Sequence, residues 1–299
     1  MNIIKDYMKN DTWRHALNAL TEETFGFNFE SWVTNGYYEG DYIPYSYEEN
    51  GKIISNVSAN IMNFEQNRKN KNYIQIGTVM TDTNHRNKGI AKELMEHVLN
   101  EYIKKCDGIY LFGDLSAVEF YKKMGFKEMK QYVYILKDDV RAHLLNQASE
   151  SVRVEGFEPV DATDVKLKEK YMDYVRNGAS NGAFEQKNKY GLQMFYTADL
   201  EDVYYSKKLD CFLVMEQNDN IIELHSILSK NVIHLEKILA GITTDYAELK
   251  LGFTPRREDA HLFACTPYDG GDDYRLFCCG EQLESIETEK LYFPTYSHA

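Results

Sequence analysis

Residues 77–91 contain the first group of side chains whose types and spacing could do chemistry. An apolar run is followed by the loop Arg86-x-x-Gly89-x-Ala91, and the loop opens directly into an amphipathic segment. The first amides of a helix have no partner inside the helix, and they favour anions. Gly89 and Ala91 are small enough for a phosphate to approach the backbone closely, while Arg86 and Lys88 add positive charge. The loop therefore predicts a pyrophosphate site.

Tyr121 is the second candidate for chemistry. It lies in a predicted helix over residues 116–124, which ends at Gly125. A phenol with an ordinary pKa near 10 keeps its proton at neutral pH and can donate it to a leaving group. The alternative is that Tyr121 only packs in the core, on the apolar face that also carries Phe120 and Met124.

These residues need a sheet and helices to position them. Alternating and β-branched residues predict a strand over 73–81, and an apolar stripe at helical spacing predicts a helix from about residue 90 to 102. Asn50-Gly51 predicts a hairpin between strands 42–48 and 52–62. Further strands are expected over 109–114 and 129–136, the latter closing the first domain.

In this order, the features over residues 1 to about 140 resemble the GNAT superfamily of N-acetyltransferases. The resemblance implies an α/β (α+β) fold with a mixed, mostly antiparallel sheet flanked by helices. It implies acetyl-CoA (coenzyme A) as cofactor, and Tyr121 as the catalytic acid. Asp114 stands where the family commonly has an Asn that touches the pantetheine, which puts that contact in doubt. The cofactor-binding residues implied by the resemblance are Val79, Met80, Thr81, Arg86, Asn87, Lys88, Gly89, Ile90, Ala91, Asp114, Ala117 and Tyr121.

The second half of the chain repeats part of this pattern. A hairpin is expected from strands 211–215 and 221–228, followed by a helix over 232–240 and a strand over 247–253. No Arg-x-x-Gly-x-Ala loop follows the hairpin. We therefore predict a tandem arrangement: a catalytic domain over 1–140 and a smaller GNAT-like α/β unit over 141–299 that lacks the pyrophosphate loop.

The general base is not selected by spacing. Candidates are Asp82, Asp114, the acidic residues of segment 37–49, and the α-carboxylate of Ala299, because some multi-domain members of the superfamily fold their C-terminus into the active site. Segment 37–49 is rich in Tyr and acidic residues, so it could form a substrate wall for an ammonium group or an ordinary half-buried strand.

Length and composition restrict the classes of protein to which the chain can belong. The 299 residues are enough for two domains, and the net charge of −13 argues against a nucleic-acid partner. No run reaches the 18 apolar residues of a membrane span, and no secretory signal is apparent at the N-terminus. Five cysteines without Cys-x-x-Cys or zinc spacing predict no metal site and a cytoplasmic location.

The expected function is transfer of an acetyl group from acetyl-CoA to a primary amine of a small molecule, by direct attack in a ternary complex. Two alternatives remain open: a protein or peptide N-acetyltransferase, and a non-catalytic acyl-CoA-binding regulator. A homodimer is also left open.

Overall fold

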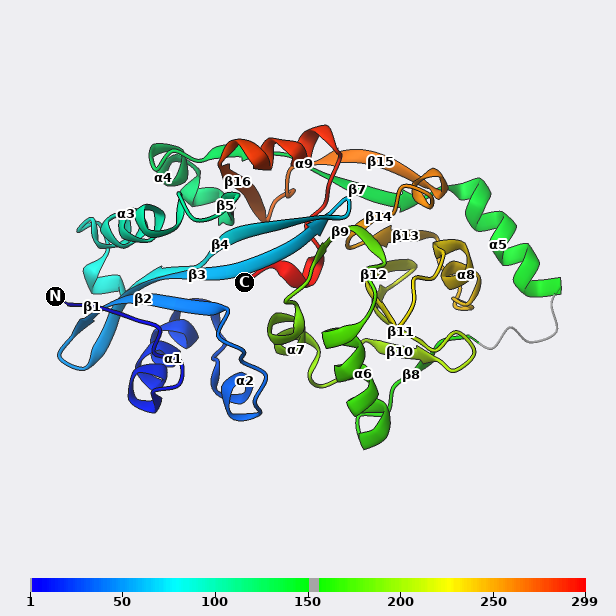
Figure 1. Cartoon of the computed structure of the whole chain (residues 1–299), viewed down its shortest axis with the longest axis horizontal. Coiled ribbons are helices and arrows are strands. Elements are labelled where there is room, and N and C mark those ends of the chain that lie inside the picture. The colour runs from blue at the N-terminus through cyan, green and yellow to red at the C-terminus, as the bar shows by residue number, and fades with distance from the viewer. Residues whose placement is uncertain (1, 151–155) are drawn as a thin grey trace.

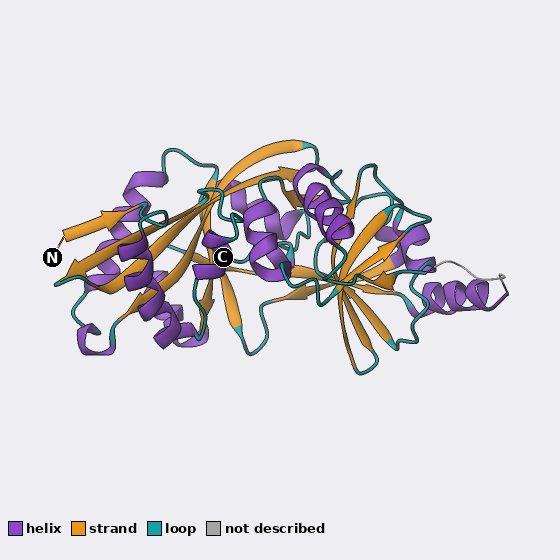
Figure 2. Cartoon of the chain, turned by 90° about the horizontal axis from the view of Figure 1, so that it is seen from below, coloured by secondary structure: helices purple, strands orange, loops and turns teal. Residues whose placement is uncertain are grey.

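Two mixed sheets with helices on their faces make up the molecule (Figure 1). The structure is a computed structural model and describes residues 2–150 and 156–299. The strands of the two sheets form separate fans in Figure 2. The predicted fold class is confirmed. Among the described strands, every pair in each sheet is antiparallel except one, β4 with β5 in the first sheet and β12 with β13 in the second.

The first sheet has the order β1-β2-β3-β4-β5-β16-β6, with β9 paired to β3 and β14 paired to β9. The predicted Asn50-Gly51 hairpin joins β2 to β3, and both residues have positive φ. The strands are β1 Asn2–Lys5, β2 Tyr42–Glu49, β3 Lys52–Gln66, β4 Lys69–Thr81, β5 Gly108–Asp114, β6 Lys127–Met129, β9 Gly182–Gln186, β14 Thr254–Pro255 and β16 Tyr274–Cys279.

The second sheet has the order β15-β7-β13-β12-β11-β10-β8. The predicted second hairpin is present as the antiparallel pair β11 and β12. The strands are β7 Gln131–Leu136, β8 Glu158–Pro159, β10 Val203–Ser206, β11 Cys211–Asn218, β12 Ile221–Ser229, β13 Glu248–Leu251 and β15 Phe263–Tyr268.

The helices cover both faces of the first sheet. Leu94, Met95 and Val98 of α3 are fully buried against one face, and Leu17 and Leu20 of α1 pack on the other. This is the outcome expected of apolar stripes at helical spacing. The helices are α1 Asp11–Phe25, α2 Glu30–Thr34, α3 Ile90–Tyr102, α4 Val118–Lys123, α5 Asp138–Glu150, α6 Val165–Asn177, α7 Tyr190–Thr197, α8 Leu235–Ala240 and α9 Ser285–Thr288.

The two sheets exchange strands, which corrects one expectation. Residues 129–136 do not form a strand that closes the first sheet; β6 ends at Met129, and β7 pairs with β13 and β15 of the second sheet. The place beside β5 is taken by β16, which comes from the end of the chain and lies between β5 and β6. The stretch expected to separate the domains contains α5.

One apolar core is shared by the two halves. Trp32 and Leu17 of the first half lie in the same buried cluster as Tyr171, Met194 and Phe212 of the second. No helix in the described part of the chain has both the length and the apolar character needed to cross a bilayer.

Candidate active site

The first sheet splits between β4 and β5. Residues 73–75 of β4 pair with residues 108–110 of β5, and beyond Gln75 the two strands have no common ladder. The later part of β5 pairs instead with β16. The backbone of β4 from Ile76 onward therefore faces an opening, where its donors are available to a ligand.

A bulge shapes β4 at this opening. Asn56 pairs with Met80 and Ser58 with Gly77, so Val57 alone lies opposite both Thr78 and Val79. Thr78 has a φ of 39°, an unfavourable backbone conformation for a β-branched residue.

Buried side chains fix the conformation of this bulge. Asn56 Nδ2 donates to the Thr78 carbonyl at 2.9 Å and lies 3.1 Å from Thr78 Oγ1. Thr78 Oγ1 also contacts the Tyr42 hydroxyl at 2.8 Å and Ser58 Oγ at 3.0 Å. Asn56 and Ser58 are fully buried, so breaking these bonds would leave polar groups without water. The network holds the strained backbone in place.

Tyr121 lies against the other side of the opening. Its ring packs on Gly113 of β5, where a Cβ would lie only 2.6 Å from Tyr121 Cε2, and on Phe277 of β16. Burial, with a smaller contribution from the negative charge of Asp114, raises the pKa of Tyr121 to about 12. Among the described residues its hydroxyl has no hydrogen-bond partner, so the proton is available to a ligand.

The predicted anion loop leads into α3. Asn87 and Gly89 both have positive φ, and Gly89 is the residue before the first turn of the helix. A Cβ built at Gly89 meets nothing within 4 Å, so the backbone there is open to an approaching group. Arg86 Nε donates to the carbonyl of Thr81, which ties the loop to the end of β4.

Residues 294–299 enter the opening from the second half of the molecule. The Ala299 amide donates to Gln75 Oε1 at 3.1 Å, and Gln75 Nε2 lies 3.4 Å from the Ala299 oxygen. That oxygen is so close to Gly77 that a Cβ there would lie 2.5 Å from it. Gly77 is therefore required by the close approach of Ala299 to the strand.

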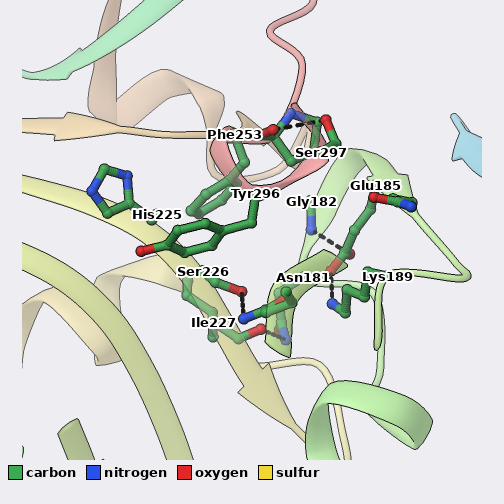
Figure 3. A pocket seen from close by; sticks show the side chains of 13 residues that line it. Asn181, Gly182, Glu185, Lys189, His225, Ser226, Ile227, Phe253, Tyr296 and Ser297 are labelled. Atoms are coloured by element: carbon green, nitrogen blue, oxygen red, sulfur yellow. Dashed lines mark hydrogen bonds and ion pairs between the residues drawn. The ribbon is translucent and has the colours of Figure 1, made fainter. Parts of the chain in front are cut away.

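The same segment also fills the corresponding split of the second sheet. β12 and β13 pair only over residues 221–224 and 248–251, and beyond them Thr295 donates its amide to Gly252 and contacts His225 Nδ1 at 3.2 Å. Figure 3 shows Tyr296 beside His225 in the cavity that remains, and its volume is only about 30 Å³. That volume suits a water molecule rather than a cofactor.

The opening in the first sheet continues into a cavity of about 480 Å³, which is large enough for an organic ligand. Val79, Asp114, Tyr121 and Ala299 all line it, so the structure brings these four predicted residues together.

Glu39 and Asp41 of the predicted acidic segment 37–49 also line the cavity, whereas the remaining residues predicted to bind the cofactor do not. The side chain of Met80 in β4 is buried, and its carbonyl accepts a hydrogen bond from Ser55 Oγ. Thr81 bonds Ser55 Oγ, and Ala117 packs against the core near Tyr121. Arg86, Asn87, Lys88, Gly89, Ile90 and Ala91 lie in the loop and first turn of α3; Ile90 is buried in the core.

Asp82 and Asp114 are held as ordinary turn residues. Asp82 accepts hydrogen bonds from His85 and the Asn84 amide, and Asp114 accepts one from the Ser116 amide. These hydrogen bonds lower the pKa of both carboxyls, with His85 the main cause at Asp82. Each is therefore a weaker base than a free carboxylate.

Sequence reasoning missed several residues of the site. Gln75 was assigned to the strand without a role, and Phe195, Tyr196 and His298 were not identified as parts of the cavity. The only signal for the α7 residues was the apolar run Met194-Phe195-Tyr196, which is equally typical of core.

The split sheet, the bulge and the open helix N-terminus define the class of fold, and comparison with known proteins agrees. Residues 6–126 match the model of the Acetyltransferase (GNAT) family. Because of this match, the chain carries a GNAT acetyltransferase domain at residues 6–126, and it is an enzyme of that class. No curated protein matches the sequence.

Solved structures extend the likeness of fold to nearly the whole chain. A conserved protein of unknown function from Enterococcus faecalis is 14% identical with a TM-score of 0.56, over 95% of this chain and 74% of that one. Eis1 from Mycobacterium abscessus is 13% identical with a TM-score of 0.53, over 92% and 73%. A GCN5-related N-acetyltransferase from Anabaena variabilis is 13% identical with a TM-score of 0.53, over 93% and 72%.

Proposed function

We propose that this protein transfers an acetyl group from acetyl-CoA to a primary amine of a small molecule, by direct attack. The observation that carries the proposal is the single cavity in which the bulged part of β4, Tyr121 and Ala299 meet. Acetyl-CoA would supply the activated thioester. The residues below would hold it and assist the reaction.

Cofactor binding is assigned to two stretches of backbone. The open amides at the start of α3, with Arg86 and Lys88 beside them, suit the pyrophosphate. The unpaired edge of β4 at Val79 suits the pantetheine arm, which can add to the strand as a further partner. Asp114 accepts a hydrogen bond from the Ser116 amide, and its carboxylate cannot donate a hydrogen bond to that arm as the amide of an Asn could.

The chemical roles follow from the groups around the opening. Backbone N–H groups at the β4 bulge would donate to the negative charge that builds on the carbonyl oxygen, and the Asn56 network keeps them preorganised. Tyr121 would protonate the departing sulfur. The Ala299 oxygen that lies beside Gly77 would accept a hydrogen bond from the attacking amine, directly or through water.

Two measurements on the intact chain test this proposal. Calorimetric titration with CoA is expected to show one site, and release of free thiol from acetyl-CoA is expected to depend on an added primary amine. Binding of CoA without amine-dependent thiol release would instead identify an acyl-CoA-binding regulator. Turnover only with peptides would identify a protein N-acetyltransferase.

A further inference from the structure

Aromatic side chains form a continuous wall along part of the cavity. Phe27 and Phe29 come from the loop after α1, Trp32 from α2, and Phe195 from α7 of the second half. Phe195 lies 5.6 Å from Phe27 and 5.7 Å from Trp32 between ring centroids, in edge-to-face arrangements. Phe27 and Phe29 meet at 5.4 Å in the same way. We call these four residues the aromatic box.

Two large aromatic residues remain exposed at the rim of this box. Phe25 is 48% exposed and stacks on Phe27 at 6.0 Å, and Tyr196 is 44% exposed. Tyr196 is held in place by a 2.7 Å hydrogen bond from its hydroxyl to the His298 carbonyl. Exposed apolar surface that continues into a cavity marks a binding site rather than a core.

The charged groups of the cavity are negative. Asp41 and Glu39 line it, and among its described lining residues there is no Lys or Arg. Glu39 is paired with Arg176 at 2.8 Å, whereas Asp41 has no cationic partner among the described residues. A cation is therefore favoured in this cavity and an anion is disfavoured.

The aromatic box itself offers a ligand no free polar group, because three of its members are Phe and Trp32 Nε1 already donates to the Gly191 carbonyl at 2.7 Å. A ligand bearing many hydroxyl or amino groups would lose its hydrogen bonds to water there without replacing them, which is costly. A flat apolar group would instead bury its surface and contact ring edges and faces.

We infer that the acceptor is a monoamine built on an aromatic or similarly large apolar skeleton, with that skeleton seated in the aromatic box. This inference rests on the proposed function, because it specifies the acceptor of that reaction. Asp41 and the ring faces attract the ammonium group on entry. The box is completed by α7, so the second half of the chain selects the acceptor.

The experiment compares matched amines in the thiol-release assay with acetyl-CoA. The amines are 2-phenylethylamine, 2-aminoethanol, 1,4-diaminobutane and glucosamine. We expect kcat/KM for 2-phenylethylamine to exceed that of each polar amine by about tenfold or more, since apolar pockets discriminate on this scale. Calorimetric titration of 2-phenylethylamine into the CoA-bound protein supplies a readout that does not require turnover.

Variants of the rim and the box separate a specific role from a structural one. Phe25→Ser changes an exposed side chain, so folding is retained, and it should lower kcat/KM for 2-phenylethylamine by several-fold and that for 2-aminoethanol by much less. Phe195→Ser should have the larger effect. Val165→Ser, at an exposed position 65% accessible and outside the cavity, is the matched control and should change neither.

Each outcome bears on one proposal or the other. Preference for a polar amine, or equal losses for both amines in Phe25→Ser, would overturn the aromatic acceptor and leave acetyl transfer intact. Binding of 2-phenylethylamine without turnover of any amine would support the aromatic box and contradict the proposed transfer.

Discussion

At the scale of single residues, the environment of Tyr121 determines what it can contribute. Burial is the main cause that raises its pKa to about 12, and the neighbouring Asp114 carboxylate adds to the shift. The phenol therefore stays protonated far above neutral pH, as a general acid for a thiolate requires. A tyrosinate in this position, acting as a base, is disfavoured by the same two causes.

Replacing Tyr121 with Phe removes the proton and keeps the ring packed on Gly113. We expect kcat to fall by about a hundredfold, the usual scale of general acid catalysis, with little change in the affinity for CoA. Rates of thiol release and calorimetric titration measure the two effects. Tyr102→Phe is the matched control, because among the described residues that hydroxyl is hydrogen-bonded to Tyr45 alone and Tyr102 does not line the cavity.

The pH dependence gives a second check on the same residue. A proton donor with a pKa of about 12 loses its proton only as the pH approaches that value. The kcat of the wild type should therefore not fall around pH 10 through ionisation of Tyr121. A descending limb near pH 10 that disappears in the variant, or a variant with normal turnover, would remove this assignment.

At the scale of elements, local signals predicted the parts of the site that depend on local structure. The Asn50-Gly51 hairpin, the α3 stripe and the loop before it all form where the sequence indicates. The exchange of β7 and β16 was not predictable, because alternation identifies a strand but not its partner. The aromatic box was missed for the same reason: its members come together only when α7 packs against α2.

Segment 294–299 is an element whose position should depend on pH. Burial lowers the pKa of His298 to about 3, from an ordinary value near 6.5. Its ring stacks on Phe112 and meets the edge of Tyr274, neither of which can stabilise an added charge by an ion pair. The buried form stays neutral while a released segment takes up a proton, so docking is fully stable above pH 6.5 and weakens as pH falls toward 3.

Amide hydrogen exchange at residues 296–299 measures this effect. After correction for intrinsic rates, protection at pH 7 should be lost progressively at pH 5 and 4, and His298→Gln should weaken that pH dependence. His261→Gln, at an exposed histidine in the second half, should leave it unchanged. Equal protection of the wild type at pH 7 and pH 4 would show that charging His298 does not release the segment.

At the scale of the whole molecule, neither sheet is complete without residues from the other half of the chain. β16 lies between β5 and β6, and its Phe277 is fully buried in the first half beside Tyr121. β7 lies between β13 and β15 in the second sheet, and its Leu136 is buried there. The two halves also share the core around Trp32 and Phe212. Their stabilities are therefore coupled.

This coupling predicts that the protein unfolds as one unit despite its two sheets. Scanning calorimetry should give a single transition, and a fragment of residues 1–140 should fail to form a soluble folded domain. Without β16 that fragment exposes one edge of β5 and the apolar surface that Phe277 covers, and β7 has no partner in it. Cys279→Ser, on the same strand at a partly buried position, tests whether an ordinary change in β16 is tolerated. Two resolved transitions, or a folded fragment with native circular dichroism, would mean that the exchanged strands contribute little to the stability of either half.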